Sequence, residues 1–78
     1  MPTVLHVGPY RFFFFAKDGE EPPHIHVERD DDNAKFWLSP VRSASNNGFR
    51  PHEFRKIEQI VIEHEEAFLE RWNEFFNL

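Results

Sequence analysis

The chain changes its hydrophobic pattern near Gly48. Before this glycine, short runs rich in Val, Phe, Ile and Trp are separated by clusters of Pro, Gly and Asp, which is typical of β-strands and their turns. After it, apolar residues recur every three or four positions, as they do on one face of a helix. The pattern predicts an α+β fold in which a sheet precedes a helix.

Four strands are expected, and the links between them are short. Parallel neighbours would need long crossover connections, so short links favour an antiparallel meander. The expected strands are Thr3–Val7, Tyr10–Ala16, His24–Arg29 and Ala34–Ser39.

Two helices are expected after the sheet. A short one covers Val41–Asn46, with Gly48 as its left-handed cap, and a long one runs from Pro51 to Phe76, with the proline in its first turn. The long helix packs its apolar stripe on one face of the sheet, and the 78 residues form a single domain. The stripe comprises Phe54, Ile57, Val61, His64, Phe68, Trp72 and Phe75.

Alternation along the strands divides the residues between two faces of the sheet. Ile25, Val27, Phe36 and Leu38 share the face that we expect beneath the helix. The opposite face mixes aromatic and charged side chains, which suggests that a partner docks there. This predicted binding surface consists of Phe13, Phe15, His24, His26, Glu28, Lys35 and Trp37, with Arg11 beside them.

The long helix outruns its sheet. Twenty-six helical residues span about 39 Å, whereas strands of this length span roughly 17–24 Å. Either the helix bends near Glu63–Glu66, or another chain, such as a second copy in a homodimer, covers its end. The residues of this expected interface are Phe68, Trp72, Phe75 and Phe76.

Composition and charge narrow the setting. The chain has no cysteine, which fits a cytoplasmic protein. Its formal net charge of -5 disfavours RNA as a general partner. The longest apolar run, FFFFA, is far too short to span a membrane. We therefore expect no membrane association.

The His-x-His pair of His24 and His26 is the most distinctive chemical feature. A strand aims both imidazoles to one side, as zinc and iron sites often require, and Glu28 is the nearest candidate for a third ligand. Two histidines and one carboxylate do not close a four-ligand site, so we expect no stoichiometric structural metal and no cofactor.

Acid–base catalysis is the other chemical interpretation of this face. His24 and His26 could move protons near neutral pH, while Arg11 and Lys35 stabilise phosphate charge. His64 lies on the apolar stripe of the helix, where a histidine with one hydrogen-bond partner is the simpler interpretation.

The segments PPHIHV, AKFWL and the pair Glu63-His64, set in an otherwise matching chain, resemble the small bacterial domain-of-unknown-function family numbered forty-one-sixty. The resemblance implies a stand-alone bacterial protein encoded beside another small gene, in the manner of toxin–antitoxin pairs. We therefore predict a protein-binding component of a two-gene module, whose partner comes from the same operon. The alternative is a small ribonuclease or metal-dependent enzyme that uses His24 and His26.

Overall fold

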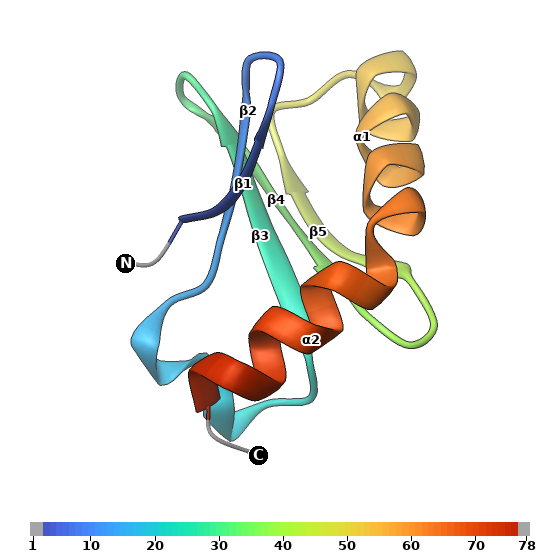
Figure 1. Ribbon diagram of the computed structural model, residues 1–78. Helices are drawn as coiled ribbons and strands as arrows, with labels where there is room; N and C mark the ends of the chain where they lie inside the picture. The colour runs from blue at the N-terminus through green and yellow to red at the C-terminus, as the bar shows by residue number, and fades with distance from the viewer. Residues whose placement is uncertain (1–2, 77–78) are drawn as a thin grey trace.

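A computed structural model describes residues 3–76. An antiparallel sheet comes first and two α-helices follow it (Figure 1), so the predicted α+β class is confirmed. The elements, in chain order, are β1 (Thr3–Val7), β2 (Tyr10–Phe13), the 3₁₀ helix η1 (Ala16–Glu20), β3 (His24–Arg29), β4 (Asp32–Trp37), β5 (Arg42–Asn47), α1 (Pro51–Glu63) and α2 (Glu65–Phe76).

The sheet is a meander whose five strands lie in chain order, β1-β2-β3-β4-β5. In the centre, His26 of β3 faces Phe13 of β2 on one side and Lys35 of β4 on the other. The predicted division into two faces is confirmed for the central strands, because Ile25, Val27 and their neighbours are buried in the core. The remaining strand residues of the core are Tyr10, Phe12, Ala34 and Phe36.

The fifth strand corrects the sequence interpretation, which predicted four strands and a short helix over Val41–Asn46. Residues Arg42–Asn47 instead pair with β4 as an exposed edge strand. Ser and Asn have low intrinsic strand preference, and pairing with a neighbouring strand overrides it. Gly48 does adopt a positive φ of 111°, but it closes the turn against Asp32, where a Cβ atom would clash.

The C-terminal segment is two helices rather than one. Pro51 begins the first and Phe76 ends the second, as predicted, but the helix breaks at His64. The half-buried His64 ring bonds through Nδ1 to the Ile60 carbonyl oxygen at 2.8 Å, which confirms the simpler interpretation of that residue. A straight helix of about 39 Å would exceed the longest dimension of the molecule, 34 Å.

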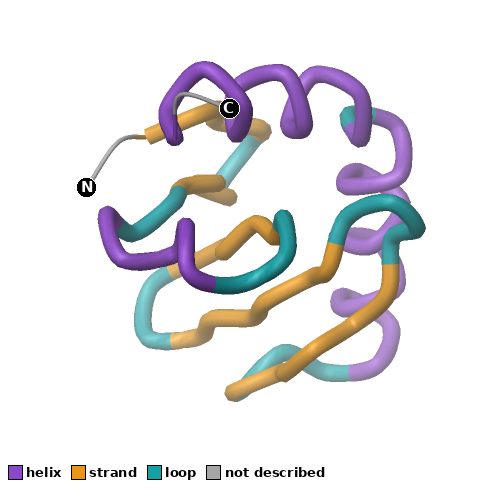
Figure 2. The backbone as a smooth tube through the Cα atoms, turned by 90° about the horizontal axis from the view of Figure 1, so that it is seen from below, coloured by secondary structure: helices purple, strands orange, loops and turns teal. Residues whose placement is uncertain are grey.

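The break lets the helices wrap around the sheet, as Figures 1 and 2 show from two directions. α1 packs Ile57 and Val61 into the core. α2 crosses the end of the sheet at which β3 begins and buries Phe68 and Trp72. None of the helices within residues 3–76 is long and apolar enough to cross a membrane.

The expected dimer interface is therefore corrected in part. Phe68 and Trp72 are fully buried within their own chain, so neither is available to a second copy. Phe76 is half-buried, and Phe75 remains 42% exposed. Of the two alternatives drawn from the sequence, the structure shows the bent helix.

A polar network ties the start of α1 to the sheet. Glu53 accepts hydrogen bonds from Tyr10 Oη at 2.7 Å and from Arg29 Nε and Nη2, both at 2.8 Å. Arg29 also bonds to Asp30 and Asp32. These contacts lower the pKa of the Glu53 carboxyl below its usual 4.5, chiefly through the Arg29 hydrogen bond and then through that of Tyr10. The network satisfies its members with fixed partners.

Candidate metal centre

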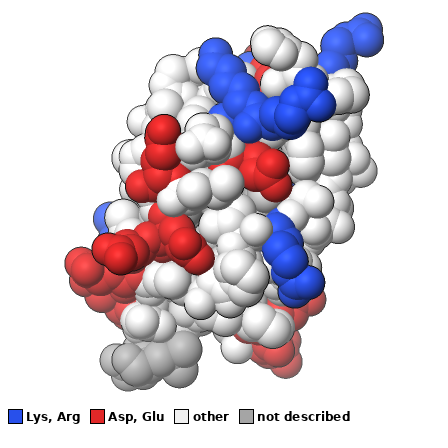
Figure 3. Space-filling model, turned by 90° about the vertical axis from the view of Figure 1, so that its right-hand side faces the viewer, with Lys and Arg blue, Asp and Glu red and all other residues white. Residues whose placement is uncertain are grey.

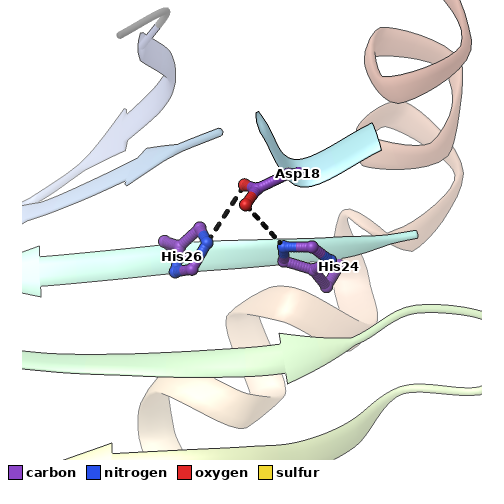
Figure 4. Close-up of side chains that lie close together, drawn as sticks. All are labelled: Asp18, His24 and His26. Carbon is purple, nitrogen blue, oxygen red and sulfur yellow. Dashed lines mark hydrogen bonds and ion pairs between the residues drawn. The ribbon is translucent and has the colours of Figure 1, made fainter. Parts of the chain in front are cut away.

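Three side chains converge where the η1 segment folds over the start of β3. Asp18 comes from η1, and His24 and His26 come from β3; Figure 4 shows the carboxylate between the two imidazoles. One ligand-type atom from each residue lies within 4.8 Å of the other two. The loop after β2 thus returns a carboxylate to the histidine face of the sheet.

His24 is fixed in one orientation. Its ring is fully buried and packs against Trp72 of α2 and Trp37 of β4, with centroid distances of 5.1 and 5.6 Å. This corrects the expectation that His24 faces solvent together with His26. The rings do share a face, 5.0 Å apart, but α2 and η1 cover the end of the sheet where His24 lies.

The two ring nitrogens of His24 have different surroundings. Nδ1 lies 2.9 Å from the carbonyl oxygen of Pro22. A carbonyl can only accept, so Nδ1 must carry a hydrogen. Nε2 lies 3.2 Å from Asp18 Oδ1, yet this buried nitrogen makes no hydrogen bond. In a neutral ring, Nε2 therefore presents its lone pair to a carboxylate that also only accepts.

A backbone N–H three residues earlier in the chain orients the Asp18 side chain. Its Oδ2 atom accepts a hydrogen bond from the Phe15 backbone N–H at 2.8 Å and lies 3.0 Å from His26 Nε2. The carboxylate, whose side chain is only 12% exposed, therefore bridges the two imidazoles. Oδ1 is left facing His24.

His26 lies nearer to solvent than His24, with 18% of its side chain exposed. Its ring stacks on Phe13 at 5.4 Å, and the Phe15 ring meets it edge to face at 4.7 Å. Burial is the largest influence on this group and lowers the pKa of His26 below its usual 6.5, although Asp18 opposes the shift. A lowered pKa keeps the ring neutral, which is the form that binds metals.

The third member of the cluster was missed by the sequence interpretation, which considered Glu28. Glu28 instead forms an ion pair with Arg11 at 3.3 Å. These two residues face each other across β2 and β3, two positions farther along β3 than His26. Asp18 lies in the polar loop KDGEEPP, which contains several carboxylates. Nothing in the sequence spacing shows which of these carboxylates folds back onto the histidines. The closeness of this loop to His24 in the sequence does limit the candidate ligands to its acidic residues.

The remaining predicted surface residues lie around the cluster. Lys35 and Trp37 lie beside the cluster, since they are the β4 partners of His26 and His24. Phe13 is buried beneath His26, and Arg11 lies over its ring at 4.4 Å. Phe15 remains 40% exposed at the rim.

A hollow of about 340 Å³ lies beside Trp37, the β4 partner of His24. The residues that line it are Pro22, Trp37, Leu38, Ser39, Pro40 and Arg42. Two of these residues, Pro22 and Trp37, also contact His24.

Comparison with known protein families identifies the family of the chain. A family model described as a domain of unknown function (DUF4160) matches residues 10–73, which include all three members of the cluster. No curated protein and no solved structure shows significant similarity to the chain.

Proposed function

The chain belongs to the DUF4160 family, whose description gives no activity, and we propose from the geometry that it binds one divalent transition-metal ion. The ligands are Asp18, His24 and His26. The observation that carries the proposal is the buried, unpartnered Nε2 of His24, which points at Asp18. Buried polar atoms normally have partners, and a cation between Nε2 and the carboxylate would supply one.

The surroundings of the cluster also support a metal. Histidines that ligate metals usually donate their second ring N–H to a carbonyl or carboxylate, as His24 does to Pro22. The Phe15 N–H similarly orients Asp18. Three tetrahedral ligands at about 2.1 Å from one ion lie about 3.4 Å apart. The ligand atoms of the cluster lie within 4.8 Å of one another, so the two that are farthest apart would have to approach by on the order of 1 Å.

The ligand set indicates the class of ion. Imidazole suits Zn²⁺, Fe²⁺ and Ni²⁺, and two histidines with one carboxylate leave coordination positions open for another ligand. This proposal departs from the expectation, drawn from the sequence, that the protein holds no metal. It favours the metal-dependent alternative that the sequence left open.

A zinc titration of chelator-treated protein tests the proposal. We expect one ion per chain with micromolar or tighter affinity, measured by calorimetry and confirmed by elemental analysis after desalting. Asp18→Asn and His26→Ala should each reduce affinity at least tenfold, as loss of a ligand does. His52→Ala removes an exposed histidine of α1 and serves as the matched control, which should leave affinity unchanged.

Two arrangements without a metal would also satisfy His24. The ring could be protonated and donate to Asp18, or a water molecule could bridge Nε2 to Trp72 Nε1, the second unpartnered buried nitrogen within residues 3–76. Failure of the wild-type protein to bind Zn²⁺, Fe²⁺ or Ni²⁺ would refute the metal and favour one of these. Equal loss of binding in His52→Ala would show that surface histidines bind the ion.

The interpretation as a toxin–antitoxin-like component that binds a partner protein is a second proposal. Its support is the exposure of three large apolar side chains, Phe15 at 40%, Phe75 at 42% and Ile62 at 48%. Apolar side chains that gather in one surface patch often mark contacts with other chains. We expect coexpression with the product of the adjacent gene to give a complex on size exclusion that Phe15→Ser or Phe75→Ser weakens. Light scattering of the protein alone would distinguish a homodimer.

A further inference from the structure

We infer that the metal centre and the adjoining hollow together bind a nucleotide, with its phosphate at the metal ion and Lys35 and its base against Trp37. This inference rests on the proposed metal site and names the class of ligand for its open positions. The observation behind it is that Lys35, the Trp37 ring and the hollow lined by Trp37 all lie beside the cluster.

Lys35 is placed to meet an anion at the centre. It is the direct β4 partner of His26, and its Nζ lies 4.4 Å from the centroid of the Trp37 ring. In the structure its ammonium group is bonded to Glu21 Oε1 at 2.7 Å. Glu21 is half-exposed, and exposed ion pairs of this kind contribute little to stability, so an incoming phosphate can displace it cheaply.

The charge of the site makes anion binding dependent on the metal. Asp18 and Glu21 carry two negative charges against one positive charge on Lys35, which leaves the centre at net -1. A divalent ion reverses this to net +1. The same centre that repels phosphate when metal-free should therefore attract it when loaded.

The hollow suits the flat part of such a ligand. Its volume of about 340 Å³ falls within the range of small-molecule sites. Trp37 offers a ring on which a base can stack, and Arg42, its partner on β5, adds a second cation. Trp37 also contacts His24, so this one ring touches both the hollow and a ligand of the metal centre.

Fluorescence titration with adenosine 5′-monophosphate tests the inference on the zinc-loaded protein. The ligand should quench Trp37, whereas Trp72 is buried and should not respond. Removing the zinc should abolish binding. Ribose 5-phosphate and adenosine, which each lack half of the ligand, should bind at least tenfold more weakly than the nucleotide.

Three variants separate recognition from structure. Lys35→Gln should weaken nucleotide binding roughly tenfold, the loss typical of a charge-assisted hydrogen bond, while zinc affinity is retained or rises slightly because a positive charge leaves the centre. Glu21→Gln removes the competing carboxylate and should tighten binding several-fold, an effect that a purely structural ion pair would not produce. Arg55→Gln, an exposed α1 residue, is the control and should have no effect.

The outcomes distinguish this inference from the proposed function. Zinc binding without nucleotide binding would overturn the nucleotide site and leave the metal site intact, whereas absence of zinc binding would overturn both. A short RNA carrying a 5′-phosphate should compete with the mononucleotide if the natural ligand is the end of a strand. Weaker binding by that RNA than by the mononucleotide would assign the site to free nucleotides.

Discussion

Strand β3 begins and ends in a polar cluster, and the two clusters are built on different principles. At its end, Arg29 meets Glu53 and Asp32 through hydrogen bonds, and Tyr10 also donates to Glu53. At its start, His24 meets Asp18 at 3.2 Å, yet its buried Nε2 makes no hydrogen bond. A network with complete partners holds elements together. A cluster with one missing partner is where we propose that an ion binds.

Figure 3 adds a view of the outer face formed by α1 and its surroundings. Most basic side chains gather toward the upper end of this face, acidic side chains lie below them, and a further basic group lies beside the acidic ones at the lower right. The ligand-type residues of the candidate site instead lie under η1, away from the α1 surface. Charge on the outside of α1 therefore does not explain the cluster at the start of β3.

The largest effect is expected where α2 covers the candidate metal centre. Trp72→Ala removes a fully buried ring that contacts both Phe14 and His24, and should lower the free energy of unfolding by about 3–5 kcal/mol. Phe75→Ala, in the same helix but 42% exposed, should cost much less. Urea unfolding checks both. Equal costs would show that α2 does not pack in solution as described.

A pair of apolar substitutions sharpens the contrast between the clusters. His24→Leu removes the unpartnered Nε2 together with the Nδ1–H bond to the Pro22 carbonyl, so the two effects oppose each other and the metal-free protein should lose little stability. The same variant should lose zinc binding. Arg29→Met leaves Glu53 without its strongest partner and should destabilise the protein. Unfolding curves measured without metal would contradict the comparison if both variants were equally destabilised.

Acid should weaken the network at the end of β3. The Glu53 pKa is held below 4.5, first by the Arg29 hydrogen bond, so the folded state favours the ionised carboxylate. Its contribution is complete above pH 4.5 and is lost as the pH falls through the folded-state pKa. We expect the melting temperature of the wild type to drop below that pH. The drop should be shallower in Glu53→Gln, and an unchanged slope would refute this role.

The smallest effect concerns His26 and the metal-free protein. Burial lowers the pKa of His26 below 6.5, so the unfolded chain takes up a proton before the folded one does. Stability should therefore be constant above pH 6.5 and decline slightly as the pH falls below it. His26→Gln should remove this slope. Saturating zinc should raise stability at neutral pH but enlarge the decline below pH 6.5, because the bound ion excludes the proton from the folded protein while the unfolded chain still takes it up.

The sequence predicted the fold where the pattern of apolar residues was strong. Alternation in His24–Arg29 placed Ile25 and Val27 in the core, and the helical stripe began at Pro51 and ended at Phe76. It failed at β5, because the exposed residues Arg42–Asn47 carry no apolar pattern. The break at His64 was foreseen only as one of two alternatives, since the stripe continues across it.

The sequence predicted the histidine pair of the candidate site but not its carboxylate. Spacing alone shows that His24 and His26 share a face, but the burial of His24 depends on Trp72, which lies 48 residues later in the sequence. Asp18 reaches the histidines because η1 folds back over β3. That path depends on tertiary packing, which no local pattern encodes.

Both edges of the sheet are irregular. The register shifts between Thr3 and Leu5 in the β1–β2 pair, and again between Lys35 and Phe36 in the β4–β5 pair. Bulges twist an edge away from the flat geometry that another strand needs, and they protect proteins from aggregating edge to edge. Neither end of this meander is therefore a ready template for growth into a fibril. Any partner that joins the molecule is expected to do so through side chains rather than by extending the sheet.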